Sequence, residues 1–110
     1  MVQFAEICQF SDRIAEAFHP DKIILFGSYA YGQPDEDSDV DLLVIMPHEG
    51  RSQDARRAIR RQATAPFAND VLVRTPDDVA RRYRQWDPLV REALDKGVIL
   101  YERDGSRVAQ

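Results

Sequence analysis

Apolar residues recur along the first segment of the chain at spacings of three, four and seven positions. This periodicity is typical of an amphipathic helix that buries one stripe. The stripe contains Phe4, Ile7, Cys8, Ile14, Ala15 and Phe18. The helix should end near His19, because a residue that precedes proline disfavours helical angles and Pro20 follows.

Short apolar runs bounded by turn-forming residues predict four strands further along the chain. These runs cover residues 22–26, about 39–46, 69–75 and 98–101. A short helix should begin with Ser28 as its N-cap and stop before Gly32. A longer helix is expected from Arg51 to about Ala63.

Two further helices are predicted from their capping signals. Thr75-Pro76 and Asp87-Pro88 each pair an N-capping side chain with a proline at the first helical position. The second of these helices should bury Leu89, Val90, Ala93 and Leu94 and end at Gly97.

The alternation of helices and strands predicts an α/β (α+β) fold, in which helices cover a small sheet. The connection from Gly27 to Asp39 is too short for a crossover helix, so the sheet should be mixed rather than purely parallel. One domain is expected over residues 1–104, with residues 105–110 as a flexible C-terminal tail.

The composition is that of an ordinary globular protein, with 44% apolar and 31% charged residues in a chain of 110. The chain has no apolar run of about 18 residues, which argues against a membrane span. No secretory signal is recognisable, and the single cysteine, Cys8, fits a reducing cytoplasm. The net charge of −4 argues against general nucleic-acid binding. An arginine-rich helix face that includes Arg56 and Arg57 is either solvated or a contact surface.

The strongest chemical signal is Gly27-Ser28, followed after ten residues by Asp39-Val40-Asp41. Side chains alternate along a strand, so Asp39 and Asp41 should project from one face. Two carboxylates this close repel each other unless a cation lies between them, and Mg²⁺ prefers oxygen ligands. The glycine-serine turn offers N–H groups and a hydroxyl to phosphates. Together these features favour metal-assisted phosphoryl or nucleotidyl transfer.

Asp70 is the candidate for a third carboxylate, because it begins an apolar strand where an uncompensated charge is costly. The residues alone leave a second interpretation open, in which Asp70 faces solvent or caps a turn.

The segments Leu25–Gly32 and Asp37–Val44 resemble the nucleotidyltransferase superfamily that includes polymerase beta, and more narrowly the minimal nucleotidyltransferase (MNT) proteins. The resemblance implies the polymerase-beta-like fold, with a small mixed sheet and packed helices. It implies that Asp39 and Asp41 bind two Mg²⁺ ions and that Asp70 helps to hold the catalytic one and draws the acceptor proton. Gly27 and Ser28 would bind the triphosphate of the NTP.

The resulting hypothesis is an enzyme that transfers NMP, most simply AMP from ATP, to a hydroxyl. The resemblance further implies an antitoxin of the HEPN/MNT type, whose acceptor is a tyrosine of a HEPN-type toxin partner. Two alternatives stay open: an antitoxin that neutralises its partner by binding alone, and a subunit of a small-molecule (antibiotic) nucleotidyltransferase. Association into a homo- or hetero-oligomer is compatible with each.

Overall fold

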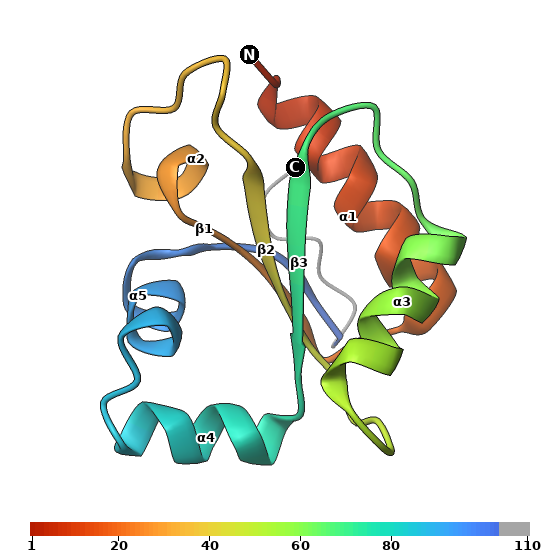
Figure 1. Cartoon of the computed structure of the whole chain (residues 1–110), viewed down its shortest axis with the longest axis vertical. Helices are drawn as coiled ribbons and strands as arrows, with labels where there is room; N and C mark the ends of the chain where they lie inside the picture. Colours follow the sequence, from red (N-terminus) through yellow and green to blue (C-terminus); the bar gives the residue numbers. More distant parts are fainter. Residues whose placement is uncertain (104–110) are drawn as a thin grey trace.

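The structure, a computed structural model, describes residues 1–103 (Figure 1). The strands are β1 (Lys22–Phe26), β2 (Val40–Ile45), β3 (Asn69–Arg74) and β4 (Val98–Glu102). The helices are α1 (Phe4–Phe18), α2 (Ser28–Tyr31), α3 (Ser52–Gln62), α4 (Pro76–Arg84) and α5 (Pro88–Lys96). The elements therefore follow the predicted order, with ends that shift by a residue or two. The tail predicted over residues 105–110 lies outside the described part of the chain.

The four strands form one sheet in the order β3-β2-β1-β4. Strand β1 runs antiparallel to both β2 and β4, whereas β2 and β3 are parallel. The short α2 connection allows only an antiparallel return, while the parallel pair is joined by a crossover that contains α3. The prediction of a mixed sheet covered by helices is confirmed.

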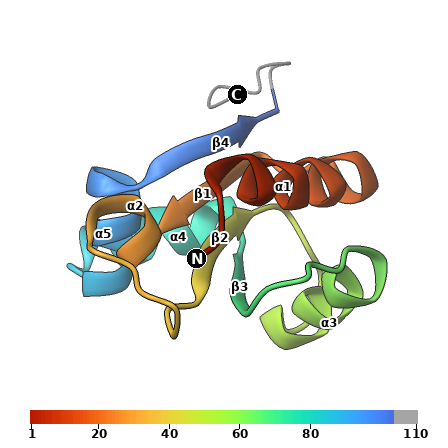
Figure 2. The same cartoon turned by 90° about the horizontal axis from the view of Figure 1, so that it is seen from above.

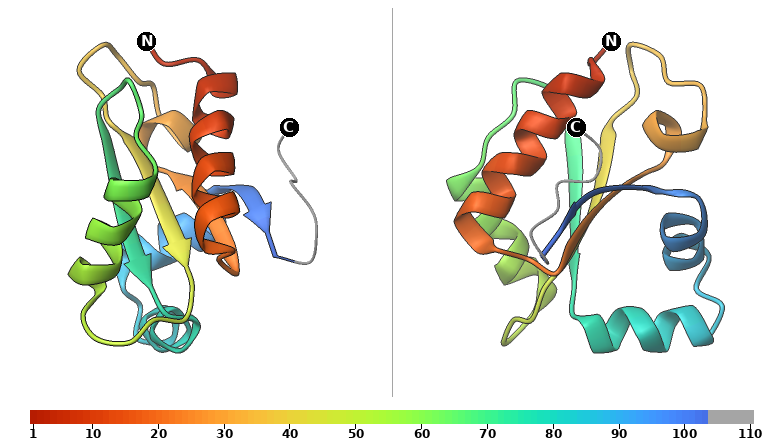
Figure 3. Two further views of the ribbon diagram at one scale, coloured as in Figure 1. Left: turned by 90° about the vertical axis from the view of Figure 1, so that its right-hand side faces the viewer. Right: turned by 180° about the vertical axis from the view of Figure 1, so that it is seen from behind.

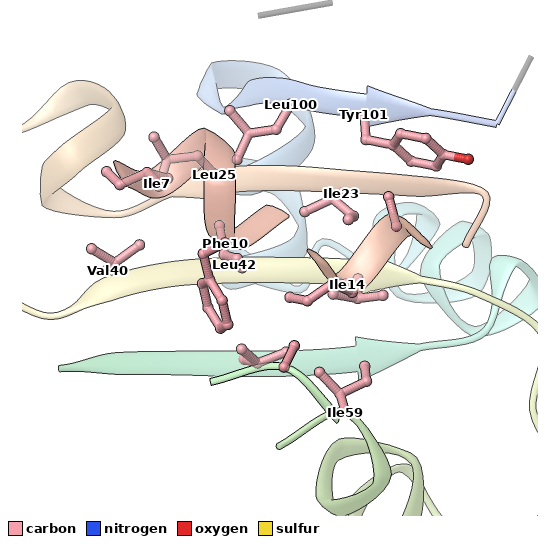
Figure 4. Packing of buried hydrophobic residues seen from close by; sticks show 14 of the residues in the cluster. Ile7, Phe10, Ile14, Ile23, Leu25, Val40, Leu42, Ile59, Leu100 and Tyr101 are labelled. Carbon is pink, nitrogen blue, oxygen red and sulfur yellow. The ribbon is translucent and has the colours of Figure 1, made fainter. Parts of the chain in front are cut away.

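Helices cover both faces of the sheet. Figure 2 shows α1 and α3 on one side, and α2, α4 and α5 on the other. The strand residues alternate accordingly: Ile23 and Leu25 of β1 belong to the cluster under α1, and Ile24 and Phe26 to the cluster under α4 and α5. Figure 4 shows Phe10 and Ile14 of α1 in the first cluster. The sheet is thus fixed from both sides, which holds its edges and ends in place.

Helices α2 and α4 lie at opposite ends of the sheet (Figures 1 and 3). The starts of β2 and β3 lie side by side at the α2 end, because Val40 pairs with Asn69. Strand β3 is an edge strand, and α3 packs beside it. These placements bring the predicted site residues to one end of the sheet.

Two local predictions need correction, and a third is confirmed. Gly27, not Ser28, is the N-cap of α2: the carbonyl of Gly27 accepts from the N–H groups of Ala30 and Tyr31. Leu89 was expected in the core, but it is 40% exposed, because α5 turns Val90 and Ala93 toward the sheet instead. Gly97 is the C-cap of α5, as predicted, and its backbone is extended. A Cβ there would lie 2.3 Å from the Ala93 carbonyl oxygen, so close packing explains this glycine.

None of the helices in residues 1–103 has both the length and the apolar character that crossing a membrane would require.

Candidate active site

Gly27 and Asp41 are in direct contact at the end of β1. Asp41 lies beside Gly27 because β2 pairs Asp41 with Phe26, the last residue of β1. Gly27 has a φ of 75°, which other residues rarely adopt, and a Cβ there would come within 2.3 Å of Asp41 Oδ2. The turn therefore requires glycine for two reasons: the positive φ, and the Asp41 carboxylate, which occupies the space that a Cβ would need.

Asp70 is the cross-strand neighbour of Asp41. The parallel pairing of β2 and β3 sets the two residues side by side, at the strand spacing of about 4.8 Å. Both side chains project from the face that carries Leu43 and Leu72, which contribute to the cluster under α4 and α5. The sequence-predicted Gly27, Asp41 and Asp70 are thus brought to one end and one face of the sheet.

Asp39 directly precedes β2 and is exposed, and Ser28 is the half-buried first residue of α2. Burial raises the pKa of the Asp41 carboxyl, and the negative charges of Asp70 and Asp39 raise it further. This shift means that the three carboxylates repel one another across a partly desolvated site. The site has an excess of negative charge that a cation would relieve.

The Asp70 carboxylate has a partner that the sequence analysis missed. Arg56 of α3 donates from Nη2 to Asp70 Oδ1 over 2.9 Å. Nothing in the spacing of the sequence indicates this contact, because it arises only when α3 packs beside the edge strand β3. Within residues 1–103, no group of three or more His, Cys, Asp or Glu side chains is arranged to hold a metal ion as it stands.

A hydrogen bond connects α2, at one side of the site, to α5. Tyr31 is 38% exposed, and its hydroxyl donates to Glu92 Oε2 over 3.2 Å. Burial raises the pKa of Tyr31, a hydrogen bond involving the Gly27 backbone lowers it, and the Glu92 charge raises it. The contact fixes α2, and with it the Gly27-Ser28 turn, against the helix that covers this face.

One cavity in the described part of the chain lies away from these residues. It has a volume of about 880 Å³ and is lined in part by Ile45, Val79, Tyr83 and Leu94. Ile45 pairs with Lys22 at the start of β1, so this cavity is at the end of the sheet opposite to Gly27 and Asp41. The chemistry of the carboxylates, rather than the size of a cavity, identifies the candidate site.

The geometry defines a class of protein: a mixed sheet with a glycine-serine turn and carboxylates at the ends of neighbouring strands. The family described as nucleotidyltransferase domain matches residues 7–100. The chain belongs to the nucleotidyltransferase domain family. The class of enzyme predicted from the sequence is thereby confirmed.

Two known proteins illustrate the relationship. A Methanocaldococcus jannaschii protein named "putative protein adenylyltransferase" is 36% identical over 53 residues, which are 48% of this chain and 54% of that protein. The match thus spans about half of the relative's length. A crystal structure of a "putative nucleotidyltransferase" from Sulfolobus solfataricus has a TM-score of 0.69 at 18% identity. It covers 96% of this chain and 86% of that one, and it confirms the fold.

Proposed function

We propose that this protein is a Mg²⁺-dependent nucleotidyltransferase that transfers AMP from ATP to a protein hydroxyl. The single observation that carries the proposal is the meeting of Asp41, Asp70 and Gly27 at one end of the sheet. Family membership supports nucleotidyl transfer as the reaction class. The name of the Methanocaldococcus jannaschii relative supports a protein as the acceptor and AMP as the transferred group.

The donor set suits a hard divalent cation. Asp39, Asp41 and Asp70 offer carboxylate oxygens. Burial first, and then the charges of Asp70 and Asp39, raise the pKa of Asp41. We propose that these three residues hold two Mg²⁺ ions, with Asp39 and Asp41 as the main ligands. Bound Mg²⁺ would supply charge neutralisation of the triphosphate and of the leaving pyrophosphate.

The remaining steps belong to the residues of the chain. The Gly27 and Ser28 N–H groups and the Ser28 hydroxyl would bind and orient the phosphates. Asp70 would take the proton from the acceptor hydroxyl as that oxygen attacks the α-phosphorus and the bond to the β-phosphate breaks. The walls formed by α2 and α5 would limit the approach of water.

We further propose that the protein is an antitoxin of the MNT type that works in the cytoplasm, and that its acceptor is a tyrosine of a HEPN-type toxin. We assign this reaction to a domain of residues 1–104.

The test is transfer of label from α-³²P-ATP with Mg²⁺ to a HEPN-type protein encoded beside this chain, or to an aminoglycoside. We expect label on a tyrosine of the protein acceptor, seen also as the mass of one AMP per site. Asp41→Ala should abolish the label. Asp77→Ala, which removes an exposed carboxylate of α4 at the other end of the sheet, should retain it.

The outcomes separate the alternatives. Label on the aminoglycoside alone would favour the small-molecule enzyme. If Asp41→Ala still protects cells from the toxin as well as the parent does, and no acceptor is labelled, protection comes from binding alone. Either result would overturn the proposed protein adenylylation.

A further inference from the structure

Arg56 of α3 forms an ion pair with Asp70, one of the predicted metal ligands. Its guanidinium meets the Asp70 carboxylate through a single pair of atoms, Nη2 and Oδ1, at 2.9 Å. The Asp70 side chain accepts no other hydrogen bond from residues 1–103. The Arg56 Nε is buried and has no hydrogen-bond partner in the same part of the chain. The pair is therefore held at one point rather than by the two parallel bonds that arginine and carboxylate can form.

The surroundings of Arg56 leave room for it to move. Arg56 lines two small cavities: one of about 170 Å³ between α3 and β3, and one of about 250 Å³ that is lined by α3 residues. The Arg56 and Asp70 side chains are 36% and 44% exposed, so the ion pair is partly solvated. An ion pair of this kind is weak, on the order of 1 kcal/mol or less. A divalent cation can therefore compete with the guanidinium for the carboxylate.

The charge balance of the site indicates a role for Arg56. Asp41 and Asp70 lie side by side on neighbouring strands, and their repulsion has to be offset whenever the site holds no metal ion. Arg56 supplies a positive charge at Asp70 through its ion pair.

We propose that Arg56 is the resident counter-ion of Asp70: it fixes this carboxylate while no divalent cation is bound and gives it up when one binds. This inference rests on the proposed function, because it takes Asp70 to be a metal ligand. Arg56 is a positioning residue in this scheme and touches neither the nucleotide nor the acceptor.

The test measures metal affinity rather than activity. Mn²⁺ is titrated into the full chain without nucleotide, and free Mn²⁺ is followed by electron paramagnetic resonance. Arg56→Gln removes a competing cation, so we expect Mn²⁺ to bind about three- to tenfold more tightly. Arg56→Lys restores the charge and should return the dissociation constant to within about twofold of the parent.

A matched control is available one residue further along α3. Arg57→Gln makes the same change in net charge, but Arg57 faces Asp54 at 3.7 Å and its side chain is 67% exposed. Screening should keep the effect of Arg57→Gln on Mn²⁺ affinity within about twofold. In an Asp70→Asn background, Arg56→Gln should no longer tighten Mn²⁺ binding, because the competition is for that carboxylate.

The results distinguish this inference from the proposal on which it rests. Equal Mn²⁺ affinities for Arg56→Gln and Arg57→Gln, with binding still lost in Asp41→Ala, would overturn the role of Arg56 and leave the metal site intact. A parent protein that binds no Mn²⁺ at all would overturn both.

Discussion

Gly27 illustrates how one residue serves the turn and the site together. Gly27→Ala would place a methyl group 2.3 Å from Asp41 Oδ2 at a φ of 75°. We expect a loss of about 1–3 kcal/mol in the free energy of unfolding, from backbone strain and from the displaced carboxylate. Nucleotidyl transfer should fall by at least about a hundredfold, because the carboxylate has to move. Urea denaturation and the labelling assay measure the two effects.

Gly50 provides the control for that substitution. It has nearly the same φ, 74°, but its nearest neighbour for a Cβ is Asp54 Oδ2 at 3.9 Å. Gly50→Ala should therefore show the backbone strain alone, about 1 kcal/mol, with transfer preserved. If both variants lose transfer equally, the contact between Gly27 and Asp41 is not what the reaction needs.

Asp41 should lower the stability of the protein in the absence of metal. The pKa of Asp41 is raised in the folded state, so folding disfavours the charged form of this side chain. The resulting decrease in the free energy of unfolding grows as the pH rises through that pKa. With EDTA at pH 7, Asp41→Asn should therefore have a higher free energy of unfolding than the parent. The gain should vanish as the pH falls below the unfolded value of 3.8, and urea denaturation across this range measures it.

At the scale of the element, α5 depends on its N-cap. Asp87 accepts from the N–H groups of Leu89 and Val90 and pairs with Arg82. The Val90 hydrogen bond and then the Arg82 contact lower the pKa of Asp87 against the effect of burial. Because α5 carries Glu92, which holds Tyr31 of α2, this cap also supports one wall of the candidate site.

Asp87→Ala should reduce the free energy of unfolding by about 1–2 kcal/mol at pH 7. The folded pKa is depressed, so the contribution is complete above the unfolded value of 3.8 and is lost as the pH falls through the folded one. The difference in the free energy of unfolding between the parent and Asp87→Ala should therefore become smaller below about pH 4, as measured by urea denaturation. Asp77 is an exposed acidic residue in the first turn of α4, and Asp77→Ala should reduce the free energy of unfolding by about 0.5 kcal/mol. Equal losses for Asp77→Ala and Asp87→Ala would contradict the capping role of Asp87.

At the scale of the whole molecule, the sequence predicts local structure well and predicts contacts between distant segments poorly. Capping by Thr75 and Asp87 could be predicted because the side chain and the N–H group lie within one turn. The neighbourhood of Gly27 and Asp41 followed from their spacing. The resemblance implied that Asp70 shares a metal site with Asp41. It gave no pairing of their strands, since strand order is not encoded locally.

The contact between Arg56 and Asp70 could not be predicted, because it depends on how α3 crosses beside the edge strand. The exposure of Leu89 was missed for a similar reason: periodicity gives the apolar stripe of α5, but the rotation of that stripe is set by the packing of Val90 and Ala93 on the sheet. Positions set by tertiary packing are therefore those where the sequence was least informative.

Ligand binding should stabilise the whole domain, because the site joins β1, β2, β3 and α2. A ligand at about 100 times its dissociation constant adds about 2.7 kcal/mol to the stability of the folded state. For a domain of this size, Mn²⁺ with a non-hydrolysable ATP analogue should then raise Tm by about 10 °C. Asp41→Asn should lose this shift, although it is the more stable protein without ligand, whereas Gly50→Ala should keep it. A shift of equal size in Asp41→Asn would mean that the ligands bind away from the carboxylates, since thermal stabilisation follows binding wherever it occurs.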